Sequence, residues 1–387
     1  MGSFIDKIIL LRFKAWSFGV RNAQKLLNRI SSKVGLSADS LFYKRMLFER
    51  REYFRNVKWT NERQKEFDQY WTTTYGSKIG SEWHRFYEAL SGVYCVDYLP
   101  ASVYLPDLAH KLNNAQMADL CGAKVMLSFF LDSPELENCI PKHYAYKIQG
   151  YYYDGNRSVL TCEELAERVA NVGACVFKSS DGSQGRGVCM LDIKDGRDVK
   201  TGQSILELFQ STKGDFVLQE RITEHSALSH LSPNSLNTIR LTTYVCQGKV
   251  YHAPIAIRFG VGDSPVDNFH AGGLGIGVQD DGTLLKTAWQ IGSHHQGIAY
   301  TQNPNNGEPF DGYKIPYMDR VIDFAEKNHG RIPGMGMVSW DFVISEDGRP
   351  IVIEVNVSKQ NPRFAQFLHG RPLFGDNTPK MLELIRR

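Results

Sequence analysis

Near the N-terminus, apolar residues recur at three- and four-residue steps, and basic residues occupy positions between them. This spacing is typical of one amphipathic helix over residues 5–30. Its apolar positions are Ile5, Ile8, Ile9, Trp16, Ala23, Leu26, Leu27 and Ile30, and its basic positions are Lys7, Lys14, Arg21 and Lys25. Such a helix either packs against protein or lies on an anionic membrane surface. Further helical pattern follows over residues 38–92, where Trp59, Trp71, Trp83 and Tyr87 are expected in the core.

The pattern becomes shorter between residues 93 and 160, where prolines interrupt it. Residues 151–153 predict a short strand that ends in a turn at Asp154. Thr161, followed by two acidic residues, predicts the N-cap of a helix that extends to about Ala170. Strands then alternate with glycine-rich turns to residue 260.

Two strongly apolar runs separated by turn residues predict a β-hairpin over residues 338–357. If Asp347 and Gly348 form a two-residue turn, antiparallel pairing places Asp341 opposite Glu354. Two facing carboxylates repel each other unless a cation lies between them. Asn356 shares the face of Glu354, because side chains alternate along a strand. Asp341, Glu354 and Asn356 are therefore candidate ligands of Mg²⁺, which prefers hard oxygen donors. The alternative is an ordinary hairpin with solvated acids.

A lysine followed by a glycine-rich segment forms the second candidate site. One predicted strand ends at Lys178, and the segment 179–187 contains three glycines before a strand over residues 188–191. Glycine lets the backbone approach a ligand closely, and successive N–H groups beside an ammonium make a cradle for an anion. The pattern is neither a P-loop nor a dinucleotide-binding turn. By itself it fits an anion-binding hairpin or a plain flexible turn.

Two arginines stand in or beside strand-like runs, where a guanidinium needs an anionic partner. Arg240 lies between Ile239 and Leu241, and Arg258 closes a predicted strand over residues 250–257. The partner is either a phosphate or acyl phosphate, with Asn237 orienting it near Arg240, or a carboxylate in a structural ion pair.

Histidines supply the remaining candidates for acid–base chemistry. His270 precedes Gly272 and Gly273, whose backbone could admit a substrate closely, and it is the candidate general base. His294 and His295 lie in a polar loop. No further ligands accompany them at zinc-binding spacing, so zinc is not expected.

Lys178 with its glycine-rich hairpin, the strand at residues 216–222 and the pattern Asp341…Glu354-x-Asn356 resemble the ATP-grasp superfamily in order and spacing. Segments 237–243 and 267–273 resemble more narrowly its sugar-transfer-associated branch. The resemblance covers residues from about 110 to about 375. It implies an α+β fold in which two lobes clasp ATP between antiparallel sheets, preceded here by a helical, basic N-terminal extension.

The resemblance also assigns roles to residues at matching positions. Lys124 and Lys178 match two phosphate-binding lysines, although Ala123 stands where the family commonly has Asp. The flap over the terminal phosphates matches Asp181, Gly182, Ser183, Gly185 and Gly187. The hinge whose backbone reads the adenine edge matches Gln219, Glu220 and Ile222, and Gln219 stands where an acid is usual. Glu224 or His225 would reach the ribose.

We predict four regions: a helical region at 1–92, an ATP-grasp-associated lobe at 93–160, the small lobe with the flap at 161–225, and the large lobe with the metal site at 226–387. Composition agrees with a folded chain, since 42% of residues are hydrophobic and 22% are charged. The net charge of +3 is uneven. Residues 1–60 contain 13 Lys or Arg and 4 Asp or Glu, a balance of +9 that leaves −6 for the rest.

An acidic body argues against nucleic-acid binding. Seven scattered cysteines without a C-x-x-C pair fit reduced thiols of a cytoplasmic protein. We expect no signal peptide and no transmembrane segment. The protein could nevertheless work at the inner face of the membrane through its basic N-terminal helix.

The chemistry that joins these parts is an ATP- and Mg²⁺-dependent ligation. The γ-phosphoryl of ATP would pass to a substrate carboxylate, and an amine would attack the acyl phosphate to form an amide. Lys178 and Arg240 would neutralise charge, while His270 would take the proton. The branch resemblance implies an amino acid or amine joined to a sugar acid in cell-surface polysaccharide biosynthesis. The alternatives are an ATP-dependent small-molecule or sugar kinase and a non-catalytic nucleotide-binding scaffold.

Overall fold

The computed structural model describes residues 46–48, 50–136, 138–179, 187–269, 272–291, 297–358, 360–361 and 363–386. The predicted amphipathic helix at 5–30 lies outside these residues. The chain divides into two compact units, one of residues 1–112 with 361–387 and one of residues 113–360. The predicted region boundaries at 92, 160 and 225 stay predictions.

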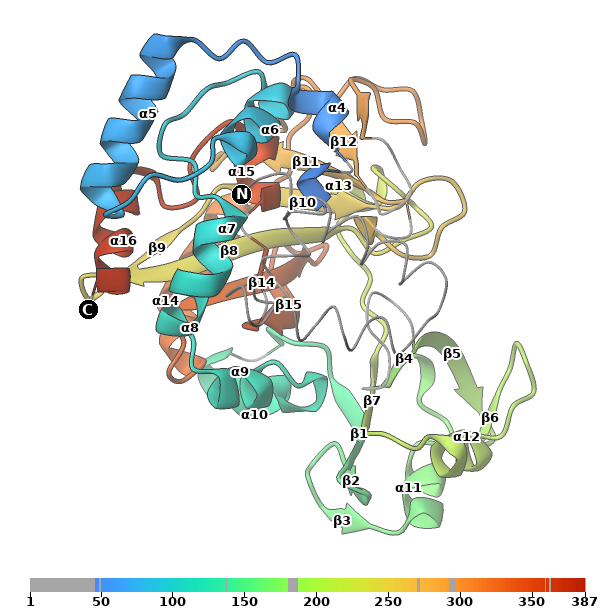
Figure 1. Cartoon of the computed structure of the whole chain (residues 1–387). Helices are drawn as coiled ribbons and strands as arrows, with labels where there is room; N and C mark the ends of the chain where they lie inside the picture. The colour runs from blue at the N-terminus through green and yellow to red at the C-terminus, as the bar shows by residue number, and fades with distance from the viewer. Residues whose placement is uncertain are drawn as a thin grey trace, which may run out of the picture. The chain divides into compact units, whose positions relative to one another are not determined.

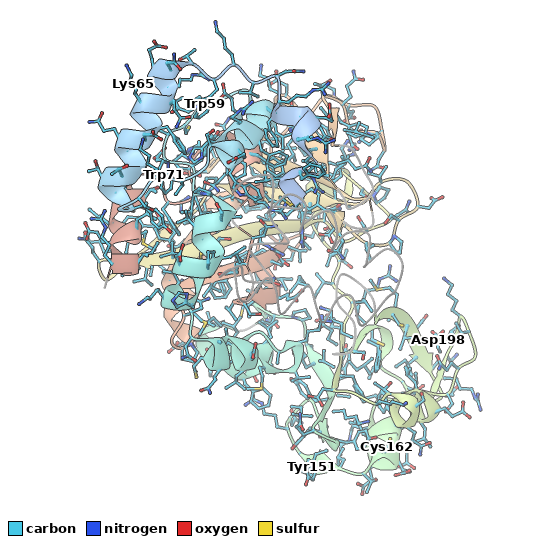
Figure 2. The ribbon with its side chains drawn as sticks, viewed as in Figure 1. Trp59, Lys65, Trp71, Tyr151, Cys162 and Asp198 are labelled. Carbon is cyan, nitrogen blue, oxygen red and sulfur yellow. The ribbon has the colours of Figure 1, made fainter. Side chains whose placement is uncertain are left out.

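The first unit is helical in its described part and has an aromatic core. Its helices are α4 (Arg51–Phe54), α5 (Asn61–Thr74), α6 (Glu82–Ser91), α7 (Ala101–Val103), the π-helical η1 (Tyr104–Leu108), α8 (Ala109–Leu112), α15 (Arg363–His369), the 3₁₀ turn η6 (Gly375–Asn377) and α16 (Thr378–Arg386). Trp71, Trp83 and Tyr87 are buried, as predicted, and Figure 2 labels Trp71 on α5. Gln366 of α15 exchanges hydrogen bonds with the backbone of Leu99, at 2.7 and 2.9 Å. The end of the chain is therefore part of this core.

The second unit contains two antiparallel sheets, and the smaller lies toward the N-terminal side of the sequence. Over the described residues its strand order is β3-β2-β1-β7-β4-β5-β6. The strands are β1 (His143–Ile148), β2 (Tyr151–Asp154), β3 (Val159–Leu160), β4 (Gly173–Ser179), β5 (Val188–Lys194), β6 (Arg197–Asp198) and β7 (Phe216–Glu220). Helices α11 (Cys162–Arg168) and α12 (Ile205–Ser211) pack on one face around Phe209 and Phe216. Figure 1 shows the two helices side by side.

Two features predicted from local sequence patterns, an N-cap and a short strand, are present in this part of the chain. Thr161 and Glu164 form a reciprocal capping box at the start of α11, which confirms the predicted N-cap. The strand and turn predicted at residues 151–154 form β2. Tyr151 is largely exposed near the outer edge of this sheet (Figure 2).

The larger sheet carries most of the candidate site. Over the described residues its order is β13-β12-β11-β10-β8-β14-β15, with β9 also paired to β8. The strands are β8 (Thr238–Cys246), β9 (Lys249–His252), β10 (Ile255–Phe259), β11 (Leu274–Val278), β12 (Ala288–Gln290), β13 (Ile298–Tyr300), β14 (Met337–Ile344) and β15 (Pro350–Asn356). The single strand predicted over residues 250–257 is wrong. The run is divided between β9 and β10 at Pro254, which has no N–H for the ladder.

Side chains along the strands of the large sheet alternate between a face that packs in the core and a polar face. Ile239 and Leu241 point into the core, with α14 (Met318–Asn328) packed there, so Thr238 and Arg240 point the other way. Shorter elements complete the unit: α9 (Ala115–Cys121), η2 (Lys124–Met126), α10 (Leu127–Leu131), η3 (Pro134–Leu136), α13 (Ser226–Ser229) and η5 (His329–Arg331). The α+β class with two antiparallel sheets is confirmed. No helix in the described ranges is long and apolar enough to cross a membrane.

Candidate functional site

A cavity of about 440 Å³ lies in the second unit and is lined by strands of both sheets. The small sheet contributes Val176 and Lys178 of β4, while the large sheet contributes Thr238 and Arg240 of β8. The predicted site residues that line the cavity are Lys124, Lys178, Gln219, Glu220, Ile222, Arg240, Asp341, Glu354 and Asn356. Positions more than 200 residues apart in the sequence thus meet in one place.

The β14–β15 hairpin pairs Asp341 with Glu354, as predicted, but its loop length and part of its register differ from the prediction. The predicted two-residue turn is wrong. Ile344 pairs with Pro350, so five residues form the loop, in which the Ser345 N–H donates to the Arg349 carbonyl at 3.0 Å. This turn shifts the register by one residue, and a β-bulge at Ile353 shifts it back before Glu354. Two deviations from the predicted hairpin therefore cancel at the site.

Asp341 is almost fully buried and is surrounded by donors. Arg240 binds both of its oxygens, with Nη2 at 2.8 Å from Oδ2. Arg258 Nη2 lies 3.2 Å and Asn356 Nδ2 lies 3.3 Å from the same Oδ2. Burial alone would raise the pKa of Asp341, but the two guanidinium groups and these hydrogen bonds outweigh it and hold the pKa below its usual range. Asp341 is therefore a charged carboxylate whose nearest described cations are arginines.

Glu354 and Asn356 have side-chain oxygen atoms that can coordinate a metal ion. Glu354 is half-buried, and no described residue donates a hydrogen bond to its carboxylate. Its charge favours the protonated forms of Lys178 and Arg258. Across the described residues no three His, Cys, Asp or Glu side chains gather as a metal cluster, so the candidate set is two carboxylates and an amide. Such hard oxygen donors fit Mg²⁺ with phosphate and water completing the shell.

Two lysines, Lys124 and Lys178, line the cavity. Lys178 lies near the end of β4, where desolvation lowers its pKa to about 8; Glu354 and Asp341 oppose this shift, and Lys124 adds to it. The Lys124 ammonium donates to the Ser179 carbonyl at 3.1 Å. Ser179 also donates its N–H to the Gly187 carbonyl at 2.8 Å, which closes the base of the glycine-rich hairpin. Gly187 has φ of 81°, a conformation that suits glycine. Asp181, Gly182, Ser183 and Gly185 lie outside the described residues.

Three residues of the hinge segment, residues 219–222, line the cavity: Gln219, Glu220 and Ile222. Gln219 is buried in β7, and the Glu220 N–H donates to the Lys142 carbonyl at 2.7 Å. Glu220 also accepts a hydrogen bond from the Lys142 N–H at 3.2 Å. Apolar side chains from both sheets line the cavity as well, namely Val176, Val188, Met190, Leu236 and Ile353. This lining suits a flat, largely apolar ring.

Several sequence candidates do not reach the cavity. Asn237 is buried behind it, and its amide donates to Glu224, to the Leu228 carbonyl and to the Ser232 carbonyl. Asn237 and Glu224 bind each other, and neither is among the residues that line the cavity. His225 caps α13 by accepting from the Ala227 N–H. His270, His294 and His295 lie outside the described residues.

Three polar residues extend the site beyond the main prediction. Arg258 donates to the Thr238 hydroxyl at 2.7 Å and lies 3.4 Å from Asp267. Thr238 in turn donates to Asp267. Thr238 and Asp267 stand in the two segments, 237–243 and 267–273, that resemble the family branch, but no role was predicted for either side chain. Alternation from Arg240 places Thr238 on the same face, and that signal was available from the sequence.

A sequence profile of the sugar-transfer associated ATP-grasp family matches residues 107–379. The chain belongs to this family. The family resemblance and the ATP-grasp fold class are therefore confirmed. A comparison with curated proteins gave no match.

Solved structures of ATP-grasp ligases are among those similar to this family member. VanG D-Ala:D-Ser ligase from Enterococcus faecalis aligns with 71% of this chain and 63% of its own, at 11% identity and a TM-score of 0.40. The ATP-grasp ligase PsnB, complexed with the precursor peptide PsnA2, aligns over 71% and 63%, at 14% identity and a TM-score of 0.37. D-alanine–D-alanine ligase from Bacillus anthracis aligns over 71% and 68%, with 14% identity and a TM-score of 0.37. This chain thus spans less than two thirds of VanG and of PsnB.

Proposed function

We propose that the protein is an ATP- and Mg²⁺-dependent ligase that joins a carboxylate to an amine and releases ADP. One observation supports this most strongly. A single cavity gathers two lysines, two arginines and three hard oxygen donors, and the hinge segment and several apolar side chains also line it. A nucleoside triphosphate has the same division between a flat apolar base and a chain of charged phosphates. Family membership supports the same reading.

In this proposal the adenine lies against the hinge segment, and the phosphates lie toward Lys124 and Lys178. Phosphoryl transfer depends mainly on positioning and on neutralising charge. Asp341, Glu354 and Asn356 would hold Mg²⁺, which supplies neutralisation of the triphosphate and polarisation of the transferred group. The flap residues Asp181, Gly182, Ser183, Gly185 and Gly187 would cover the terminal phosphates.

Arg240 and Arg258 would receive the acid substrate. A carboxylate oxygen attacks the γ-phosphorus, and the bond to the ADP oxygen breaks. The amine nitrogen then attacks the acyl carbon, phosphate leaves, and the amine loses a proton, with His270 as the candidate base. Both guanidinium groups now contact Asp341. An Asp341 carboxylate that also held Mg²⁺ would bind both guanidinium groups less tightly and would leave them more available to an anionic substrate.

The substrates and location are further parts of the proposal. The sugar-transfer association of the family supports an amino acid or amine joined to a sugar acid in cell-surface polysaccharide biosynthesis. The balance of +9 in residues 1–60 supports work in the cytoplasm at an anionic membrane face. The acidic remainder of the chain does not favour nucleic acid as a partner.

The test combines the protein with Mg-ATP, pooled amino acids and individual uronic acids, and follows ADP and products by mass spectrometry. The proposal predicts ADP formation that depends on both an acid and an amine, with an amide product. A phosphorylated product without an amide would instead indicate a kinase. Absence of ATP binding and turnover under every combination would leave a scaffold role and contradict the proposal.

A further inference from the structure

A second and larger cleft lies beside the hinge segment. Its volume is about 1020 Å³, compared with about 440 Å³ for the nucleotide cavity. Glu220 and Ile222 line both spaces, whereas Arg221 and Thr223 line only the second. We call this second space the hinge cleft. The proposed nucleotide chemistry does not use it.

Four cationic side chains converge on the hinge cleft from separate segments. They are Lys142 before β1, Arg168 at the end of α11, Arg221 after β7 and Arg349 before β15. Arg168 lies 3.4 Å from Asp154, and Arg349 lies 2.6 Å from Asp347. Within the described ranges, neither Lys142 nor Arg221 forms an ion pair. The cleft therefore has two exposed cations available to an anionic ligand.

The carboxylates of the hinge cleft are already engaged. Asp154 accepts hydrogen bonds from the backbone N–H groups of Asn156 and Ser158, at 3.0 and 2.9 Å. Asp132 pairs with Arg157 at 2.9 Å. Glu220 accepts from the Lys142 backbone. Asp132 and Asp154 thus each lie beside an arginine, and four cationic side chains line the cleft against three acidic ones.

The remaining lining indicates which class of anion fits. Hydroxyl and amide side chains supply uncharged hydrogen-bonding groups, and aromatic rings supply apolar surface. These residues are Ser133, Asn138, Asn156, Thr223 and Ser345, with Tyr144 and Tyr146. An extended peptide would need an open strand edge, but β1 is paired on both sides, with β2 and β7. A ligand with many hydroxyls and a few negative charges matches this lining better.

We infer that the hinge cleft binds an anionic carbohydrate, with Lys142 and Arg221 holding its carboxylate or phosphate groups. Binding in the hinge cleft is coupled to nucleotide binding, because Lys142 exchanges two hydrogen bonds with Glu220 of the hinge segment. The coupling rests on the proposed nucleotide site, while carbohydrate binding does not. Since the cleft shares only Glu220 and Ile222 with the nucleotide cavity, its ligand is an effector or a distant part of a long substrate.

Calorimetry with defined probes tests this inference. The probes are trigalacturonic acid, glucose 1-phosphate, neutral maltotriose and a triaspartate peptide. The test variant is the double change Lys142→Glu and Arg221→Glu, and both residues are exposed. The control variant reverses two exposed lysines elsewhere, Lys194→Glu and Lys249→Glu. A nonhydrolysable ATP analogue is titrated into each protein, with and without saccharide.

We expect an acidic or phosphorylated sugar to bind at least about tenfold more tightly than maltotriose, a preference that the test variant loses and the control keeps. Selection of trigalacturonic acid or of glucose 1-phosphate identifies the anionic group. Saturating saccharide should change the affinity for the ATP analogue in the wild type but not in the test variant. Equal binding of maltotriose, equal or better binding of triaspartate, or an equal loss in the control would overturn the inference. If the wild type binds saccharide but no ATP analogue, the proposed function fails while the carbohydrate site stands.

Discussion

At the scale of single residues, Asp341 has two roles that compete. Its Oδ2 atom accepts from Arg240, Arg258 and Asn356 in the described structure, and the proposed Mg²⁺ site needs the same carboxylate. The sequence predicted that a cation must lie beside the facing acids. In the structure two arginines contact Asp341, whereas no described residue donates a hydrogen bond to Glu354. Metal binding and arginine contact at Asp341 should therefore oppose each other.

If Arg258 competes with a metal ion for Asp341, the substitution Arg258→Met should strengthen metal binding. Removing one guanidinium frees Asp341, so Mn²⁺ should bind in the presence of an ATP analogue at least about fivefold more tightly than to the wild type. Electron paramagnetic resonance of Mn²⁺ measures this affinity, and thermal unfolding checks that the variant is folded. Weaker Mn²⁺ binding in a folded variant would show that Arg258 supports the metal site and does not compete with it.

Glu354→Gln tests the second carboxylate. The substitution keeps size and polarity but removes the charge, so turnover should fall by about 100-fold or more, the effect of losing one preorganised electrostatic group. The fold should remain intact because Glu354 is half-buried and has no described hydrogen-bond donor. Steady-state ADP release and circular dichroism provide the measurements. Turnover at the wild-type rate would remove Glu354 from the site.

Lys178 predicts the pH dependence of nucleotide binding. Its pKa is lowered to about 8, chiefly by desolvation, so in the free protein the ammonium is charged below pH 8 and loses its proton above it. Affinity for the ATP analogue should be highest below pH 8 and about tenfold lower at pH 9. Lys178→Arg, whose side chain stays charged, should remove this decline. An unchanged profile in that variant would assign the titration to another group.

At the scale of elements, sequence patterns predicted side chains better than turns. The pairing of Asp341 with Glu354 agrees with the prediction only because the longer loop and a β-bulge shift the register in opposite directions. The loop length was wrong, since Ser345 and Arg349 bond to each other and lengthen the turn. The alternation of apolar and polar residues did not predict the compensating bulge at Ile353. No sequence pattern predicted that Asn237 would be buried against Glu224.

The loop before β11 should be sensitive to one methyl group. A Cβ at Gly275 would lie 2.2 Å from the Phe269 ring, and Asp267 of the same loop contacts Arg258. Gly275→Ala should destabilise the fold by about 1–3 kcal/mol and weaken ATP-analogue binding. Gly330→Ala is the matched control, since its Cβ would meet nothing, and should stay within about 0.5 kcal/mol of the wild type. Similar unfolding curves for the two variants would contradict the predicted crowding.

At the scale of the whole molecule, the sequence predicted the two-sheet α+β architecture through its family resemblance. The profile match over residues 107–379 confirms it. The predicted regions could not show that residues 361–387 join residues 1–112 in one compact unit, because that contact links the two ends of the chain. The hinge cleft was also beyond prediction, since its cations come from four separate segments. Convergence of this kind depends on tertiary structure.

The most direct test of the central claim is a crystal structure with Mn²⁺ and a nonhydrolysable ATP analogue, with Mn²⁺ located by its anomalous scattering. We expect Mn²⁺ between the phosphates and the oxygens of Asp341, Glu354 and Asn356. The adenine should lie against residues 219–222, with Lys178 at the phosphates. Nucleotide bound outside this cavity, or Mn²⁺ with no contact to the β14–β15 hairpin, would contradict the account.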